Sequence, residues 1–516
     1  MQTLRRLPGF LPGARPRISC RSIATKARSD ITLTAGDVIN LECTDLAFGG
    51  DGVCKLEDGF VVFVPRALPG EKLSAKVTSA KSGFARARKL ETLTPHDHVD
   101  TPQCQHFGPC GGCALQSLQY SAQVGLKEHQ VRSLMRRLAG VASTTLEDIV
   151  RPIIPCEHPY EYRNRMEFSL DPDSLELGLH YPGSQDRVLS IKNCSLQEPL
   201  ANEMLAQIQN VLMKHGVLDD DLKRGNAWPA NQTQRRSSYS KGRDRDGPQR
   251  VLEHVVIRHS VAERNYLVNF VTNRDARDLL APVVEELREK FKDSLAGCVN
   301  SVAAKGRPVA ERRIAKEYTL EGNGYLVETL GGLEYEISPN AFFQVNTRQA
   351  EKLFRYVLEA AAVQPDDVVL DLYCGSGAIT LLLAQQCRRA HGVEVSAIAV
   401  DDARKNARRN HLTNVKFTAA DAAAPLHPKL LASDIIVVDP ARPGLTPNVV
   451  ESIRSTTARR VVYVSCNPST QARDIGALCD PNDELVGRPF KLVAVQPVDM
   501  YPQTPHVESV AVLERI

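Results

Sequence analysis

Strand-like apolar runs alternate with amphipathic stretches through the C-terminal part of the chain. The runs VVLDLY, AHGVEV, DIIVVDP and VVYVSC are short and continuously apolar, and the stretches between them have helical spacing. This rhythm is typical of a parallel, doubly wound α/β sheet with helices on both faces. We expect this domain to span residues 326–516 and to end in two strands near 490–498 and 507–514.

Residues 30–93 show a different pattern, in which short strand-like runs are separated by glycines. Such spacing predicts a small β-barrel. Six basic residues and no acidic residue lie between Lys72 and Lys89, and strand alternation places Arg86 and Arg88 on one face. We interpret this face as a surface for the RNA backbone, with an ordinary solvated strand face as the alternative.

The region 94–325 is mixed in pattern. It contains a cysteine cluster, a helical stretch near 121–139, and strands around 160–170 and 251–260. The segment 219–250 within it is polar and nearly devoid of aliphatic residues, so we expect a disordered insertion. Its eight basic residues either help to hold RNA or belong to a solvated loop without a role.

Residues 1–29 contain seven basic residues and no acidic residue, which is typical of an organellar transit peptide. We expect a mitochondrial address, with a plastid address or a basic RNA-binding arm as alternatives. The leader holds seven of the 64 basic residues, so 57 remain against 61 acidic residues and the net charge falls to near −4. RNA binding must then come from local basic patches. No apolar run reaches the length of about eighteen residues that predicts a membrane span.

Thirteen cysteines without a secretory signal indicate a reducing compartment rather than a disulfide framework. Cys104, Cys110 and Cys113 form a C-x5-C-x2-C cluster, which is one ligand short of a tetrahedral metal site or an iron–sulfur cluster. Cys194 is the best candidate for the fourth ligand. The spacing alone leaves zinc and iron–sulfur open.

Polar residues follow several of the C-terminal strands. Gly375 and Gly377, in the turn DLYCGSGA, let the backbone approach a ligand, while the incomplete three-glycine pattern disfavours NAD. Glu394 ends the next strand, where an acid accepts hydrogen bonds from ribose, and Asp421 and Asp439 end later strands. Each acid alone is equally compatible with a helix cap, but together they predict a nucleotide-like cofactor at one sheet edge.

Cys466 ends the apolar run VVYVSC, and Glu508 lies near the chain end in HVES. A thiolate that attacks C6 of uracil makes C5 able to accept a methyl group, and a base must then remove the C5 proton. Glu508 in a partly desolvated pocket suits that base, whereas a structural cysteine and an exposed glutamate are the alternatives. In DPARPG, Arg442 stands where amino-group methyltransferases carry a base-stacking aromatic, so methylation of an exocyclic nitrogen is disfavoured.

Several motifs occur together along the chain. They are FGGDGV with VVFVPRALPGE, CQHFGPCGGCALQSLQY, SPNAFFQVNT, DLYCGSG with GVE and DPAR, YVSCNP, and TPHVES. This combination resembles the RNA uracil-C5 methyltransferases that use S-adenosylmethionine, in the branch with an N-terminal TRAM domain and a [4Fe–4S] cluster. The resemblance covers residues 31–516 apart from the insertion 219–250.

The resemblance implies a multidomain α/β protein. Its parts would be an OB-like TRAM β-barrel (30–93), a central α+β iron–sulfur domain (94–325) and a doubly wound, Rossmann-like methyltransferase domain (326–516). Cys466 would be the nucleophile and Glu508 the base. The implied iron ligands are Cys104, Cys110, Cys113 and Cys194. The implied S-adenosylmethionine contacts are Gln344, Tyr373, Glu394 and Asp439, to which the strand-end pattern adds Gly375, Gly377 and Asp421.

From these features we expect a monomeric enzyme that methylates C5 of a particular uridine in structured RNA, either ribosomal or transfer RNA. The uridine must flip out of its stack for C6 to reach Cys466. One rival is an RNA-binding or chaperone protein that keeps a methyltransferase scaffold without turnover. Another is a small-molecule methyltransferase, which would not require the basic barrel.

Overall fold

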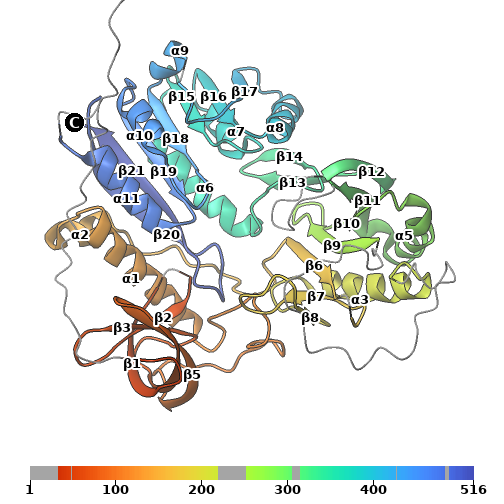
Figure 1. Ribbon diagram of the computed structural model, residues 1–516. Helices are drawn as coiled ribbons and strands as arrows, with labels where there is room; N and C mark the ends of the chain where they lie inside the picture. The colour runs from red at the N-terminus through yellow and green to blue at the C-terminus, as the bar shows by residue number, and fades with distance from the viewer. Residues whose placement is uncertain are drawn as a thin grey trace, which may run out of the picture.

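The computed structural model describes residues 33–47, 49–171, 173–218, 251–304, 314–425, 427–482 and 487–516. The expected leader (1–29) and the expected insertion (219–250) lie outside these residues. The described chain forms an N-terminal barrel, a central sheet with helices, and a C-terminal sheet with helices (Figure 1). None of the helices in these ranges is long and apolar enough to cross a membrane.

The N-terminal part is a closed barrel with strand order β1-β2-β3-β5-β4, as the sequence predicted. The strands are β1 (Val38–Leu46), β2 (Asp51–Lys55), β3 (Val61–Pro65), β4 (Lys72–Ala80) and β5 (Phe84–Thr94). Ala85 and Ala87 of β5 point into the barrel core, while Arg86 and Arg88 are exposed. The alternation confirms that the two arginines share one outward face.

The basic face of the barrel is partly neutralised by acids of the barrel itself. Arg86 forms an ion pair with Asp51 (2.9 Å), and Lys89 forms one with the buried Glu71 (2.6 Å). Ion pairs with nearby acids reduce the charge that these two residues offer to a phosphate backbone. The surface therefore presents less positive charge than the run of basic residues suggested.

The central part is a seven-stranded sheet in the order β12-β11-β10-β9-β6-β7-β8. Its strands are β6 (Arg165–Leu170), β7 (Leu177–His180), β8 (Val188–Ser190), β9 (Leu252–His259), β10 (Tyr266–Thr272), β11 (Leu295–Ala303) and β12 (Ile314–Gly322). Helices α3 (Pro199–Lys214) and α5 (Arg277–Phe291) share one core with this sheet. Because β10 and β11 pair in parallel, α5 and the short 3-10 helix η1 (Lys292–Ser294) form the crossover between them.

The C-terminal sheet has the order β17-β16-β15-β18-β19-β21-β20. Its strands are β15 (Val368–Leu372), β16 (Arg389–Glu394), β17 (Val415–Ala419), β18 (Ile435–Val438), β19 (Arg460–Ser465), β20 (Phe490–Val498) and β21 (Glu508–Arg515). Its helices are α6 (Thr347–Ala361), α7 (Ala378–Ala384), α8 (Ala397–Arg409), α9 (Pro428–Leu431), α10 (Pro447–Arg454) and α11 (Pro468–Cys479). The hairpin of β13 (Leu326–Leu330) and β14 (Leu333–Ile337) precedes α6.

The predicted all-parallel pairing is wrong at one end of this sheet. Strands β15 to β19 are parallel, but β21 lies between β19 and β20 and is antiparallel to both. Residues 499–507, which join β20 to β21, are too few for the helical crossover that parallel neighbours require. The mixed edge brings the start of β21 to the carboxyl end of β19.

Helices cover both faces of the C-terminal sheet, as expected. Alternate residues of β19 show this division: Val462 and Val464 belong to the core with α6, α7 and α8, whereas Val461 and Tyr463 belong to the core with α10 and α11. A strand that is buried on both faces is continuously apolar, which explains the run VVYVS.

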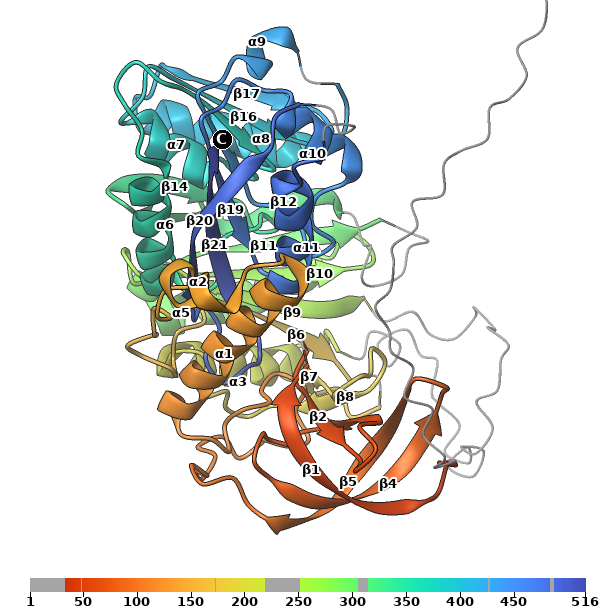
Figure 2. The same ribbon diagram turned by 90° about the vertical axis from the view of Figure 1, so that its left-hand side faces the viewer.

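Helix α1 (Tyr120–Leu138) was expected in the central domain, but it packs on the C-terminal one. The short helix α2 (Ser143–Ile149), which was not predicted, packs there as well. Val131 and Met135 of α1 share a core with α10, α11 and the C-terminal sheet. The backbone that follows α2 runs along β20, where the amide of Ile154 donates to the carbonyl of Pro497 (3.0 Å). Figure 2 shows α1 and α2 between this sheet and the barrel. The cores thus assign α1 and α2, which lie within the range 94–325 expected for the central domain, to the C-terminal domain.

Candidate active site

The strand register brings the predicted nucleophile and the predicted base together. The antiparallel pairing of β19 with β21 runs from Arg460 opposite Glu514 to Ser465 opposite Ser509. One further step of the same register sets Cys466 opposite Glu508. Two residues from distant parts of the sequence therefore lie side by side at one edge of the sheet.

Glu508 is almost completely buried, with 4% of its surface exposed. Burial raises the pKa of its carboxyl to about 8, and the nearby carboxyl of Asp439 adds to this effect. The hydroxyl of Tyr501, which donates to Oε1 of Glu508 (3.4 Å), and the charge of Arg442 act in the opposite direction. Such a carboxyl exchanges its proton near neutral pH, as a general base must.

Cys466 is half-buried at the end of β19. Burial, together with the carboxyls of Glu508 and Asp439, raises the pKa of its thiol to about 11, while the charge of Arg442 acts in the opposite direction. The thiol therefore holds its proton at neutral pH in the absence of substrate. Attack on a substrate requires a proton acceptor beside the sulfur, and these two carboxyls are available there.

The turn after β15 is shaped by left-handed backbone. Tyr373, Gly375 and Gly377 have φ angles of 67°, 55° and 85°. A Cβ at Gly377 would lie 2.9 Å from Cζ of Phe417, so a larger residue would clash there. The turn holds its amides close to the strand end, where a ligand approaches in sheets of this type.

Glu394, at the end of β16, ties this turn to the next one. Its Oε2 accepts from the amide of Gly375 (3.2 Å) and its Oε1 from the amide of Ser396 (2.8 Å). Beside it, Val395 and Ile398 are each 72% exposed. Two exposed aliphatic side chains next to a carboxylate suit a ligand with one flat apolar part and one hydroxylated part.

The remaining acids differ in their surroundings. Asp439, after β18, is half-buried, and burial raises the pKa of its carboxyl to about 7. Asp421 is exposed and accepts from the amide of Ala423 (2.9 Å), so it caps a turn as the alternative interpretation allowed. Asp371, which was not predicted, is buried beside Thr380, and burial raises the pKa of its carboxyl to about 7.

Gln344 lies in the loop between β14 and α6, with only 8% of its surface exposed. Its backbone carbonyl accepts from Nδ2 of Asn164 (2.8 Å), but its side-chain Oε1 has no hydrogen-bond partner among the residues that the structure describes. A buried amide oxygen without a partner is costly, so it indicates a donor supplied by a ligand.

Phe342 was not singled out from the sequence. It is 72% exposed, whereas Phe343 beside it is buried in the core, and Gln344 follows. A large exposed aromatic next to a ligand-facing polar group is a candidate for stacking on a base. The sequence feature that could have indicated it is the pair Phe342 and Phe343 in an irregular segment, because only one of two adjacent side chains there is expected to pack in the core.

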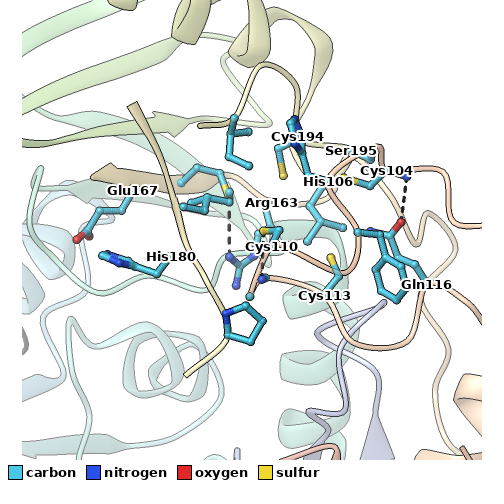
Figure 3. A pocket seen from close by; sticks show the side chains of 18 of the residues that line it. Cys104, His106, Cys110, Cys113, Gln116, Arg163, Glu167, His180, Cys194 and Ser195 are labelled. Atoms are coloured by element: carbon cyan, nitrogen blue, oxygen red, sulfur yellow. Dashed lines mark hydrogen bonds between the residues drawn. The ribbon is translucent and has the colours of Figure 1, made fainter. Parts of the chain in front are cut away.

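The four predicted metal ligands line one cavity of about 370 Å³ in the central domain (Figure 3). They are Cys104, Cys110, Cys113 and Cys194. Burial raises the pKa of the Cys113 thiol to about 12, and the other three thiols act in the same direction, which shows that they are close. In the described part of the chain, no group of three or more His, Cys, Asp or Glu residues is arranged to hold a single metal ion.

Arg163 joins the cysteine cavity to the active site. It lines the cavity together with Arg165, so the two arginines face the same space. Its charge lowers the pKa of Cys194 on one side and those of Tyr501 and His506 on the other. The cavity and the segment that leads to Glu508 are therefore neighbours.

Comparison with known proteins adds an independent result. A TRAM domain matches residues 33–90, a tRNA (uracil-5-)-methyltransferase model matches 262–424, and a methyltransferase domain matches 364–500. An uncharacterized RNA methyltransferase of Chlorobaculum tepidum is 32% identical over 511 residues, covering 95% of this chain and 98% of the relative. One from Gloeobacter violaceus is 34% identical over 489 residues, covering 94% and 98%. The chain belongs to the RNA (uracil-5-)-methyltransferase family.

The fold of this methyltransferase also matches a solved structure. The crystal structure of Pyrococcus abyssi tRNA (uracil-54, C5)-methyltransferase in complex with S-adenosyl-L-homocysteine covers 92% of this chain and 99% of its own, with a TM-score of 0.67 and 23% identity. The barrel is thus a TRAM domain and the C-terminal domain a methyltransferase domain. The enzyme is an RNA methyltransferase.

Proposed function

We propose that this methyltransferase forms 5-methyluridine at a particular uridine of ribosomal or transfer RNA, through a covalent bond between Cys466 and C6 of the ring. The observation that carries the proposal is the strand register, which pairs Ser465 with Ser509 and so places the next residues, Cys466 and Glu508, beside each other. The carboxyl of Glu508 is close enough to raise the pKa of the Cys466 thiol. A nucleophile and a base of raised pKa at one strand end are what this chemistry needs.

In this mechanism Cys466 adds to C6, its proton passes to a neighbouring carboxylate, and the electron pair of the C5–C6 double bond moves toward O4. This addition makes C5 nucleophilic. Bound S-adenosylmethionine supplies an electrophilic methyl group. The carboxylate of Glu508 then takes the proton from C5, the double bond forms again, and the bond between C6 and the sulfur of Cys466 breaks. Asp439 lies close enough to the thiol to change its pKa, which supports it as the first proton acceptor and leaves Glu508 ionised for the proton of C5.

The donor is proposed to lie against the carboxyl ends of β15, β16 and β18. One observation fits it: Oε1 of Gln344 is a buried acceptor without a partner in the described ranges. Glu394 with Val395 suits a ribose and an adenine. The full set of proposed contacts is Gln344, Tyr373, Gly375, Gly377, Glu394, Asp421 and Asp439.

RNA is proposed to approach across the barrel and the central domain. Arg88 is exposed on the barrel face and suits phosphate contacts, which are tolerant of sequence. Phe342 is proposed to stack on a base near the flipped uridine. The expected leader makes mitochondrial RNA, or plastid RNA, the first place to look for the modified uridine.

The cysteine cavity is proposed to hold a [4Fe–4S] cluster bound by Cys104, Cys110, Cys113 and Cys194. Thiolates that share one zinc ion lie about 3.8 Å apart, as its bond lengths and tetrahedral geometry require. The four thiols line one cavity, and the resemblance of CQHFGPCGGCALQSLQY to the cluster-binding segment of the family favours a cluster in which each cysteine binds a different iron.

The cluster is proposed to support the loop that leads to Glu508. The amides of Ala114 and Leu115, directly after Cys113, donate to the carbonyl of Gln503 (2.9 and 3.0 Å). A cluster that fixes Cys113 would fix this contact. The proposed reaction transfers no electrons, so the cluster has a structural or RNA-positioning role.

Anaerobically purified protein is expected to contain iron and acid-labile sulfide in equal amounts, about four of each per chain. Cys113→Ser is expected to lose most of both, measured by chemical analysis and visible absorbance. Cys156→Ser is the control, because Cys156 is a buried cysteine that does not line the cavity. Zinc without sulfide in the wild-type protein would contradict the cluster.

The proposed function predicts where a labelled methyl group goes. Purified protein is incubated with methyl-labelled S-adenosylmethionine and total organellar RNA from cells that lack this protein. Label in 5-methyluridine at one or a few positions supports the proposal. Binding of RNA without label would favour the scaffold without turnover, and label in small molecules alone would favour a small-molecule methyltransferase.

A further inference from the structure

Tyr501 contacts the proposed base directly. It lies in residues 499–507, which join β20 to β21, and its hydroxyl donates to Oε1 of Glu508 (3.4 Å). Its ring meets the ring of His506 edge-on, with the centroids 6.3 Å apart. The hydroxyl thus reaches the base from the same short segment that leads into it.

Helix α1 holds the segment that carries Tyr501 through a buried ion pair. Nζ of Lys127 lies 2.6 Å from Oδ1 of Asp499, and the two side chains are 2% and 0% exposed. The same ammonium donates to the backbone carbonyl of Tyr501 (3.0 Å). A buried pair of this kind is strongly oriented because neither charge has water as an alternative partner.

Two further contacts hold the next residues of the segment. Nε2 of Gln123 donates to Oε1 of Gln503 (2.9 Å), and the amide of Gln503 donates back to Gln123 (3.0 Å). The hydroxyl of Tyr162, from the central domain, donates to the carbonyl of Pro502 (3.0 Å). Elements on two sides therefore fix the backbone, and the Tyr501 hydroxyl is positioned before any substrate binds.

Four groups face the carboxyl of Glu508 from the elements around it. Asp439, from the end of β18, disfavours its ionised form, and Cys466, from the end of β19, is close enough for Glu508 to raise the pKa of its thiol. Arg442, from the loop after β18, and Tyr501 favour the ionised form. Burial and Asp439 raise the pKa of Glu508, and without the tyrosine hydroxyl Arg442 would be the one group of these four that lowers it.

We propose that Tyr501 is a positioning residue for the base: its hydroxyl holds Oε1 of Glu508, so that Oε2 takes the proton from C5 and the carboxylate stays ionised for that step. Tyr501 keeps its own proton throughout. The proton of C5 passes to Oε2, and the electron pair of the broken C–H bond restores the ring double bond as the sulfur leaves. This inference rests on the proposed function.

The first test needs no RNA. Infrared difference spectra, recorded across a pH range on the whole protein, follow the protonated carboxyl of Glu508, and the band is assigned by its absence in Glu508→Gln. A hydrogen bond to a charged group is strong enough to shift the titration midpoint by about one pH unit. Tyr501→Phe is therefore expected to move the midpoint upward by about that amount. An unchanged midpoint would overturn the inference.

The second test follows proton removal itself. The probe is total organellar RNA, tritiated at uridine C5, from cells that lack the protein, and release of tritium is compared with methyl transfer. Glu508 accepts the proton in its ionised form. Because Tyr501→Phe raises the pKa of Glu508, the low-pH side of the plot of tritium release rate against pH (the acid limb) should move to higher pH. In Tyr501→Phe we expect tritium release to be about tenfold slower than in the wild type at neutral pH. At alkaline pH the two proteins should release tritium at similar rates. The rate of methyl transfer should be unchanged.

Tyr162→Phe is the matched control, since it loses a hydrogen bond to the same segment without contacting Glu508. Its acid limb is expected to stay in place, and an equal shift in both variants would mean that Tyr501 is merely structural. If the wild type releases no tritium, or Glu508→Gln releases it at the normal rate, the proposed function itself is wrong. If those two behave as proposed and Tyr501→Phe keeps the wild-type limb, only this inference fails.

Discussion

Replacing Cys466 by alanine is expected to abolish formation of 5-methyluridine, with a loss of about four orders of magnitude or more. Uracil C5 is not nucleophilic until C6 has been attacked, and the register leaves Cys466 as the thiol opposite Glu508. The measurement is methyl transfer from labelled donor to RNA under single-turnover conditions. Because the donor site lies on other strands, donor binding by calorimetry should be nearly unchanged.

The chain offers a matched control for this substitution. Cys479, at the end of α11, is also half-buried, and burial likewise raises the pKa of its thiol to about 11. It lies at the end of the helix that starts directly after Cys466 and Asn467. Cys479→Ala should therefore keep wild-type activity. Full activity in Cys466→Ala would remove the covalent mechanism.

Replacing Glu508 by glutamine is expected to trap the enzyme on its RNA. Glutamine keeps the size of the side chain but cannot accept a proton, so methyl transfer proceeds while elimination slows by about 10²–10⁴-fold. The adduct is measured as a protein–RNA band that survives denaturing electrophoresis and carries the methyl label. In the wild type, the elimination rate should rise with pH up to about 8, the pKa to which burial raises the Glu508 carboxyl.

The double variant Cys466→Ala with Glu508→Gln is the control for the trapped complex. It should form no covalent band, because the bond to RNA is made by the sulfur. If Glu508→Gln releases methylated RNA at the normal rate, another group is the base. Asp439 would then be the next candidate, because it also lies at this sheet edge with a carboxyl whose pKa burial raises to about 7.

Local patterns accounted for much of the fold. The alternation in β5, the glycine turn after β15 and the run VVYVS all predicted their elements correctly. These patterns depend on spacing within a few residues, because a strand or helix must turn its apolar side chains to a core wherever that core is. The position of α1 does not follow from such spacing, and it was assigned to the wrong domain.

The sequence by itself determined the kinds of element, the cysteine motif and the chemical groups available at the strand ends. Only the tertiary structure decided which groups meet: the antiparallel β21 sets Glu508 opposite Cys466, and α1 reaches across to hold the segment of Tyr501. The reason is that side-chain periodicity is local, whereas register between distant strands and the docking of a helix depend on surfaces that exist only once the chain has folded.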